Sequence, residues 1–199
     1  MTASNEGPIT LGITGASGAP YAVRLLRALN DSRTPTRLII SSYGMRLLAE
    51  ELEIGGIDEL RAATGDWSRV ELYEPGDRGA TPASGSAPSA GMVICPCSMG
   101  TLASIAAGTS RNLVERAADV ALKEQRSLIL VPRETPLSTI HLENMSRLAR
   151  AGATILPASP GFYHRPSSVD DLVDFIVARI MAHLGLPFSM NRWKSGEVS

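Results

Sequence analysis

Short apolar runs alternate with segments of helical periodicity along most of the chain. The runs predict strands at Ile9–Thr14, Arg37–Ser41, Val70–Tyr73, Gly91–Cys95, Ser127–Val131 and Thr154–Pro157. Apolar residues recur with a helical period over Ala19–Asn30, Met45–Glu53, Ser98–Ala107, Leu113–Glu124, Ser138–Ala151 and Val169–Leu184. Continuous apolar strands such as MVIC and LILV are typical of strands buried on both faces. The pattern therefore predicts an α/β fold, in which helices cover both faces of a mostly parallel sheet.

Two segments interrupt the alternation. The stretch from Glu74 to Ala90 is rich in Gly, Pro, Ser and Ala, and it predicts a long loop that is either a surface excursion or a binding loop. The tail from residue 186 to residue 199 has no clear period, and we expect it either to trail or to close over the site.

Length and composition narrow the class of protein. A chain of 199 residues fits one domain, 1–199, with a sizeable core. A formal net charge of −1 lacks the basic surplus of a nucleic-acid binder. We find neither a signal-like N-terminus nor an apolar run that could cross a membrane, so we expect a cytoplasmic protein.

Metal and disulfide chemistry are not expected. Cys95 and Cys97 stand two apart on a strand and so point to opposite faces. His141, His164 and His183 are far apart and show no ligand spacing, so we predict no metal site.

The first strand runs into a small-residue turn that opens a helix. Gly15 and Gly18 in TGASGA allow backbone N–H groups to approach an anion, which predicts a phosphate cradle. Only two glycines fall in this turn, so it departs from the G-x-G-x-x-G of dinucleotide enzymes. The Ser17 hydroxyl is left with three roles: it caps the helix, holds a phosphate or passes a proton.

The fourth strand ends in a second turn of the same kind. In CPCSMGT, Ser98 and Thr101 supply hydroxyls ahead of a helix of small residues. Ser98 either caps this helix or joins Met99, Gly100 and Thr101 in binding a ligand. A flat aromatic ligand with a phosphate arm would use both turns.

Other polar residues follow the strand ends, where open parallel sheets bind ligands. Arg133 and Glu134 come after the fifth strand, and Tyr163 comes after the sixth. Arg116 and Lys123 stand seven apart on one helix face, as a solvated stripe or as a phosphate-binding edge. From spacing alone, Glu51 is an ordinary helix-face carboxylate.

Six stretches in order carry a resemblance over nearly the whole chain. They are TGASGA, CPCSMGTL, NLVERAADVALKE, LVPRETP, HLENM and PASPGFYHRP. Together they resemble the UbiX-like flavin prenyltransferases. The resemblance implies a flavodoxin-like (Rossmann-like) three-layer αβα fold and a metal-independent transfer of a dimethylallyl group from dimethylallyl monophosphate to N5 and C6 of reduced FMN. It also implies a homododecamer whose active sites lie between subunits, and a UbiD-type decarboxylase that receives the prenylated FMN.

The resemblance also implies roles for individual residues. FMN would be held by Gly15, Ala16, Ser17, Ser41, Ser98, Met99, Gly100, Thr101 and Arg133. The prenyl phosphate would be held by Arg116, Lys123, Glu134, Tyr163 and Arg179, partly across a subunit boundary. Ser17 and Glu51 would move protons.

One position departs from the family pattern. Arg78 stands where the family often has a tryptophan near the prenyl group. Trp67, Tyr73 or Trp193 could supply the missing aromatic wall; otherwise the prenyl donor differs or activity is lower. Two alternative functions remain at this point, a flavin-dependent cysteine decarboxylase and a carrier that binds FMN without chemistry.

Overall fold

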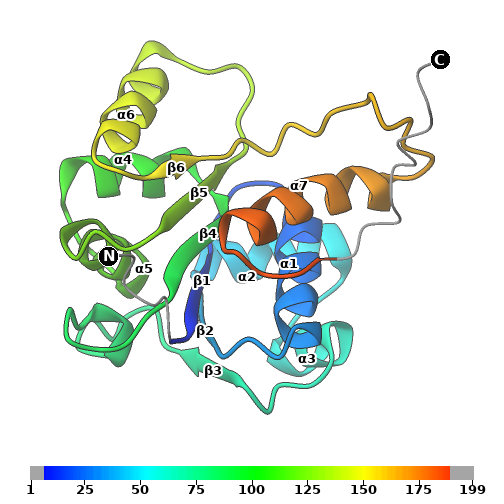
Figure 1. The fold of residues 1–199 in the computed structure, drawn as a ribbon, viewed down its shortest axis with the longest axis horizontal. Helices are drawn as coiled ribbons and strands as arrows, with labels where there is room; N and C mark the ends of the chain where they lie inside the picture. Colours follow the sequence, from blue (N-terminus) through cyan, green and yellow to red (C-terminus); the bar gives the residue numbers. More distant parts are fainter. Residues whose placement is uncertain (1–6, 189–199) are drawn as a thin grey trace.

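The computed structural model describes residues 7–188 and shows one six-stranded sheet (Figure 1). The strand order is β3-β2-β1-β4-β5-β6, and every pairing is parallel. The strands are β1 (Ile9–Ile13), β2 (Thr36–Ile40), β3 (Val70–Tyr73), β4 (Gly91–Cys97), β5 (Leu128–Pro132) and β6 (Thr154–Ile155). The predicted parallel sheet is confirmed.

Within residues 7–188, seven helices form the two outer layers. They are α1 (Ala19–Asp31), α2 (Ser42–Leu52), α3 (Ile57–Thr64), α4 (Met99–Ala107), α5 (Leu113–Lys123), α6 (Thr139–Arg150) and α7 (Val169–His183). One buried cluster joins the sheet to α1, α2, α3 and α7, and a second joins it to α4, α5 and α6. Figure 1 shows the sheet between these two groups. The three-layer αβα prediction is therefore confirmed.

Strands β1 and β4 lie side by side in the middle of the sheet. Ile9 pairs with Thr36 of β2 on one side and with Gly91 of β4 on the other. The chain builds outward from β1 towards β3, returns, and builds outward from β4 towards β6. The carboxyl ends of β1 and β4 thus flank the topological switch point, which is where open α/β sheets bind ligands.

Burial explains the apolar strand runs. Every residue of β1, β2, β4 and β5 is buried, whereas edge strand β3 is half exposed. Helices on both faces remove the central strands from water, so those strands need no polar face.

One helix and the start of another differ from the sequence prediction. Helix α3 was not predicted, because IDELRAAT is short and mostly polar, and only Leu60 and Thr64 on it are buried. Helix α2 starts at Ser42 instead of Met45, because the Ser41 hydroxyl accepts a hydrogen bond from the Gly44 N–H at 3.0 Å and caps the helix there. Gly44 carries no side chain, so it adds no apolar position to the helical pattern that begins at Met45.

The predicted loop 74–90 is present, with one short 3-10 turn at Thr81–Ala83. It lies along α5. The Leu113 N–H donates to the Pro75 carbonyl at 2.8 Å, and the Arg126 guanidinium donates to the Gly85 carbonyl. The loop is a packed crossover from β3 to β4. Within residues 7–188, no helix is long and apolar enough to cross a membrane.

Candidate active site

The two turns predicted to act together meet at the switch point. The Thr14 hydroxyl, at the end of β1, donates to the Pro96 carbonyl at 2.9 Å and accepts from the Ser98 N–H at 2.9 Å. Thr14 is 2% exposed, so both bonds are shielded from water. This side chain holds the TGASGA turn and the CPCSMG turn in one fixed relation.

The start of α4 is open. Ser98 caps the helix by accepting from the Thr101 N–H at 3.2 Å, and its hydroxyl also reaches the Thr101 hydroxyl at 3.0 Å. The Met99 and Gly100 N–H groups donate to no atom of the described chain. A Cβ added at Gly100 would meet nothing within 4 Å. These free donors, at the positive end of a helix, suit an anion.

The start of α1 is closed by a side chain from α2. The Glu51 carboxylate accepts from the Gly18 N–H at 2.9 Å and from the Ala19 N–H at 2.8 Å. The next helix position is Pro20, which has no N–H, and the Tyr21 N–H bonds to the Gly18 carbonyl at 3.0 Å. The first-turn donors of α1 are therefore already used, and the anion that they bind is part of the protein.

Ser17 is not the cap of α1. The cap residue is Gly18, with φ 130°, and no side chain of its own supports the helix. The Ser17 side chain is exposed, and the Ser17 carbonyl accepts from the Arg133 Nε at 3.2 Å. Of the three roles left open for this hydroxyl, capping was wrong.

Gly15 makes a close approach possible. A Cβ at this position would lie 2.5 Å from the Tyr43 Cβ at the start of α2. The glycine therefore lets the β1 turn and the capped start of α2 pack together. Ser41 caps α2 at the same edge of the sheet.

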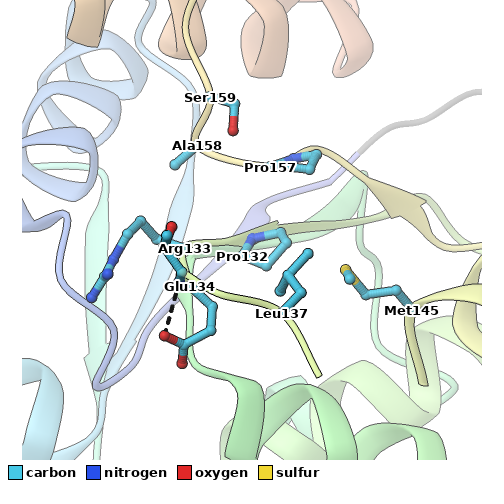
Figure 2. A pocket seen from close by; sticks show the side chains of 9 residues that line it. Pro132, Arg133, Glu134, Leu137, Met145, Pro157, Ala158 and Ser159 are labelled. Carbon is cyan, nitrogen blue, oxygen red and sulfur yellow. Dashed lines mark hydrogen bonds between the residues drawn. The ribbon is translucent and has the colours of Figure 1, made fainter. Parts of the chain in front are cut away.

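Arg133 and Glu134 project from the carboxyl end of β5 (Figure 2). They border a pocket of about 130 Å³. Its lining is Pro132, Arg133, Glu134, Thr135, Leu137, Met145, Pro157, Ala158 and Ser159. Arg133, which borders this pocket, also contacts the β1 turn through its hydrogen bond to the Ser17 carbonyl.

Lys123, at the end of α5, lies at the other end of the sheet in the same chain. Lys123 ends α5 just ahead of β5, whereas Arg133 follows the end of β5. Five strand residues span about 17 Å at 3.3 Å each. Arg116 pairs with Asp119 at 2.8 Å, and Lys123 pairs with Glu124 at 3.0 Å. One chain therefore does not bring Lys123 to the pocket.

The remaining predicted phosphate contacts are Tyr163 and Arg179, and both are exposed. The Tyr163 ring packs edge-on against His164 at 5.8 Å and Phe175 at 5.7 Å, while His164 stacks flat on Phe175. This aromatic group fixes the phenol ring ahead of α7, the helix that carries Arg179.

The cysteines have no catalytic role in this geometry. Both are fully buried, and burial raises the pKa of the Cys97 thiol to about 12 and that of Cys95 further. Neither thiol forms a reactive thiolate near neutral pH. Among the described residues, no group of three or more His, Cys, Asp or Glu is placed to hold a metal ion.

The aromatic residues proposed to replace the family's tryptophan lie in different parts of the molecule. Trp67 lies before the amino end of β3, where its indole donates to the Thr64 hydroxyl at 2.8 Å. It is therefore at the wrong end of the sheet. Tyr73 ends β3 at the carboxyl edge and is half-buried, and Arg78 is exposed. Trp193 lies outside the described residues.

The family model described as Flavoprotein matches residues 2–181. A relative from Pseudomonas aeruginosa named flavin prenyltransferase UbiX is 49% identical, with 94% of this chain and 95% of the relative covered. The chain belongs to the UbiX flavin prenyltransferases. The UbiX proteins are thus the members of the Flavoprotein family with which the site of this chain is compared.

Two solved UbiX-like structures share the fold. One is a dodecameric FMN-dependent UbiX-like decarboxylase from Escherichia coli O157:H7, with a TM-score of 0.84 and 43% identity over 95% of this chain and all of that one. The other is AnUbiX (PadA1) in complex with FMN and dimethylallyl pyrophosphate, with a TM-score of 0.83 and 38% identity over 94% of this chain and 98% of that one. The family resemblance and the flavodoxin-like fold expected from the motifs are confirmed.

Proposed function

We propose that this protein transfers a dimethylallyl group from dimethylallyl monophosphate to N5 and C6 of reduced FMN. The observation that carries the proposal is the switch point, where an open helix start and a start closed by Glu51 stand side by side, with Arg133 next to them. The start of α4 offers N–H donors to an anionic ligand. The start of α1 holds the Glu51 carboxylate at the same edge of the sheet.

The residues present fit FMN. The free N–H groups of Met99 and Gly100, with the Thr101 hydroxyl that the capping Ser98 contacts, form a donor set for a phosphate group. The open space at Gly100 leaves room for close approach. Gly15, Ala16, Ser17 and Ser41 are proposed to form the opposite side of this cradle, with Arg133, which donates to the Ser17 carbonyl, beside it. AnUbiX (PadA1), which shares the fold, has been solved with FMN.

The prenyl phosphate needs cations that one chain does not gather. Its leaving oxygen carries the electron pair of the broken C–O bond, so donors aimed at the phosphate lower the barrier. Arg116, Lys123, Tyr163 and Arg179 are proposed as these donors. Glu134, a carboxylate, is proposed to lie at the same site, and Lys123 stands at the opposite end of the sheet from Glu134.

A second copy of the chain would complete this site. The pocket beside Arg133 is about 130 Å³, and small-molecule sites usually hold roughly 300–1,000 Å³. We propose an oligomer, a homododecamer as in the E. coli relative, in which Lys123 and Arg116 of one subunit face the pocket of another. The separation of Lys123 from the pocket within one chain supports this arrangement.

Glu51 and Ser17 are proposed for the proton step. Bound reduced FMN supplies nucleophilic ring atoms, and closure of the new ring at C6 releases the proton of that carbon. Glu51 is fixed beside Ser17 by the adjacent Gly18 N–H, so an exposed hydroxyl and an anchored carboxylate share one turn. Such a pair can pass a proton when water is excluded.

The product would serve a UbiD-type decarboxylase, and we place the protein in the cytoplasm as part of the same proposal. The cysteine decarboxylase alternative is not favoured, because the P. aeruginosa relative matched over nearly the whole chain is a named prenyltransferase.

The direct test is product mass. Purified protein given reduced FMN and dimethylallyl monophosphate without oxygen should yield a flavin heavier by one five-carbon unit, with release of one phosphate. A flavin that stays bound but unchanged in mass would refute the transferase and favour a carrier.

A further inference from the structure

The end of α5 gathers an unusual set of groups over Gly85 of the loop 74–90. The Lys123 Nζ and the Glu124 Oε1 are 3.0 Å apart, and both lie against the place where a Gly85 Cβ would be. The Arg126 guanidinium donates to the Gly85 carbonyl. Two cations and one carboxylate therefore converge on one loop residue.

Hydroxyls complete the surroundings. Ser84 and Ser86 flank the glycine, and their hydroxyl oxygens are 3.0 Å apart. Ammonium, guanidinium and hydroxyl groups are the donors that proteins use for phosphate. The Glu124 carboxylate contacts the ammonium of this set, where an incoming anion would bind.

Helix stability does not explain this carboxylate. Glu124 is the C-cap residue of α5, where the partial negative charge of the helix end disfavours an acidic side chain. The ion pair is also accessible, since the Lys123 side chain is 60% exposed and that of Glu124 is 36% exposed. An accessible pair of this kind is weak and easily exchanged.

We propose that Glu124 is a built-in competitor for the prenyl phosphate. Its carboxylate neutralises Lys123 in the empty site, moves off when the donor binds, and returns when free phosphate leaves. The proposal rests on the proposed function, because it takes Lys123 as a contact of the donor phosphate. The same residue would then lower donor affinity and favour release of the phosphate product.

The test is a binding titration of the assembled protein loaded with oxidised FMN, which lacks the electron-rich ring needed for alkylation. Calorimetry with dimethylallyl monophosphate should show that Glu124→Gln lowers the dissociation constant about twofold to fivefold, the range set by an exposed ion pair. The inhibition constant of inorganic phosphate should fall in parallel. Glu50→Gln is the matched control, because it breaks the exposed Arg46–Glu50 pair on α2 and should change neither constant.

Gly85→Ala tests the same contact from the other side. Its Cβ would collide with the Glu124 Oε1, so the carboxylate must move, whereas the Lys123 Nζ, 3.3 Å from the Cβ, is the flexible end of a side chain and needs only a small shift. Gly85→Ala alone should lower the dissociation constant of the donor. In a protein that already carries Glu124→Ala, it should leave that constant unchanged. Donor binding that is unchanged or weaker in Glu124→Gln would overturn the proposal.

Two further outcomes separate this inference from the proposed function. If Lys123→Met leaves donor binding unchanged while wild-type protein still makes the heavier flavin, the inference fails and prenyl transfer stands. If reduced FMN and donor give no heavier flavin with wild-type protein, the proposed function fails, and the inference fails with it.

Discussion

The starts of α1 and α4 are built from similar sequences but offer opposite surfaces. Each follows a central strand through a turn of small and hydroxyl residues. At α1, the Gly18 and Ala19 N–H groups are bound by Glu51, whereas at α4 the Met99 and Gly100 N–H groups have no partner in the described chain. One helix start therefore carries a fixed negative charge, and the other is free for a ligand's charge. A glycine turn ahead of a helix indicates a possible anion site, but tertiary contacts decide which anion fills it.

The largest effect on activity is expected when the Glu51 carboxylate at the start of α1 is replaced by a neutral amide. Glu51→Gln keeps an oxygen that can accept from Gly18 and Ala19 but removes the proton-accepting carboxylate. FMN should still bind, while formation of the four-ring product falls by about a hundredfold or more, as is usual for loss of a general base. Anaerobic product analysis by mass and absorbance measures this.

The neighbouring Glu50→Gln is the matched control, because it alters the same helix on its exposed face. Normal turnover in Glu51→Gln would reduce Glu51 to a structural cap.

A smaller effect is expected when the open start is made to resemble the closed one. Gly100→Asp puts a carboxylate into open space at the first turn of α4. It should weaken FMN binding about tenfold to a hundredfold, the equivalent of one or two lost charge-assisted hydrogen bonds of about 1.5 kcal/mol each. The same carboxylate should stabilise the helix in the FMN-free protein by about 0.3–1 kcal/mol.

Fluorescence titration with FMN measures the expected loss of affinity, and urea unfolding of the FMN-free protein measures the expected gain in stability. Gly100→Asn, which has similar size without charge, should retain most of the affinity. Equal loss in both variants would show that space, and not charge, governs the site.

A matched pair of glycines tests the packing difference between the two helix starts without any change of charge. Gly15→Ala should destabilise the protein by about 1–3 kcal/mol, because its Cβ would meet the Tyr43 Cβ, which cannot swing away without movement of α2. Gly100→Ala meets nothing and lies in a helix, so it should stabilise by up to about 1 kcal/mol. Urea unfolding midpoints compare the two, and similar values would contradict the difference in packing.

Much of the fold was predictable because burial leaves a clear trace in the chain. The apolar runs of β1, β2, β4 and β5 indicated strands covered on both faces, and helical periodicity located six of the seven helices. Helix α3 escaped because a short, mostly polar segment has little periodicity. The predicted start of α2 at Met45 was wrong, because Gly44 interrupts the apolar pattern although the helix, capped by Ser41, already begins at Ser42.

The site was predictable in part. The switch point brings together the Gly15 and Ser98 turns, as parallel strand ends must, and Arg133 joins them. The division of labour between the turns was not visible, since Glu51 reaches Gly18 across 33 positions. Nor did spacing show that Lys123 lies at the far end of the sheet from Arg133.

The sequence by itself determined the layer architecture, the two glycine turns and the family, because these depend on local periodicity and on motifs that lie within one strand–turn–helix unit. Only the tertiary structure decided which helix start is free to bind an anion, which carboxylate faces Lys123, and which cations one chain cannot gather. Such contacts join residues that are distant in sequence, or set distances that only packing defines, and no local pattern encodes them.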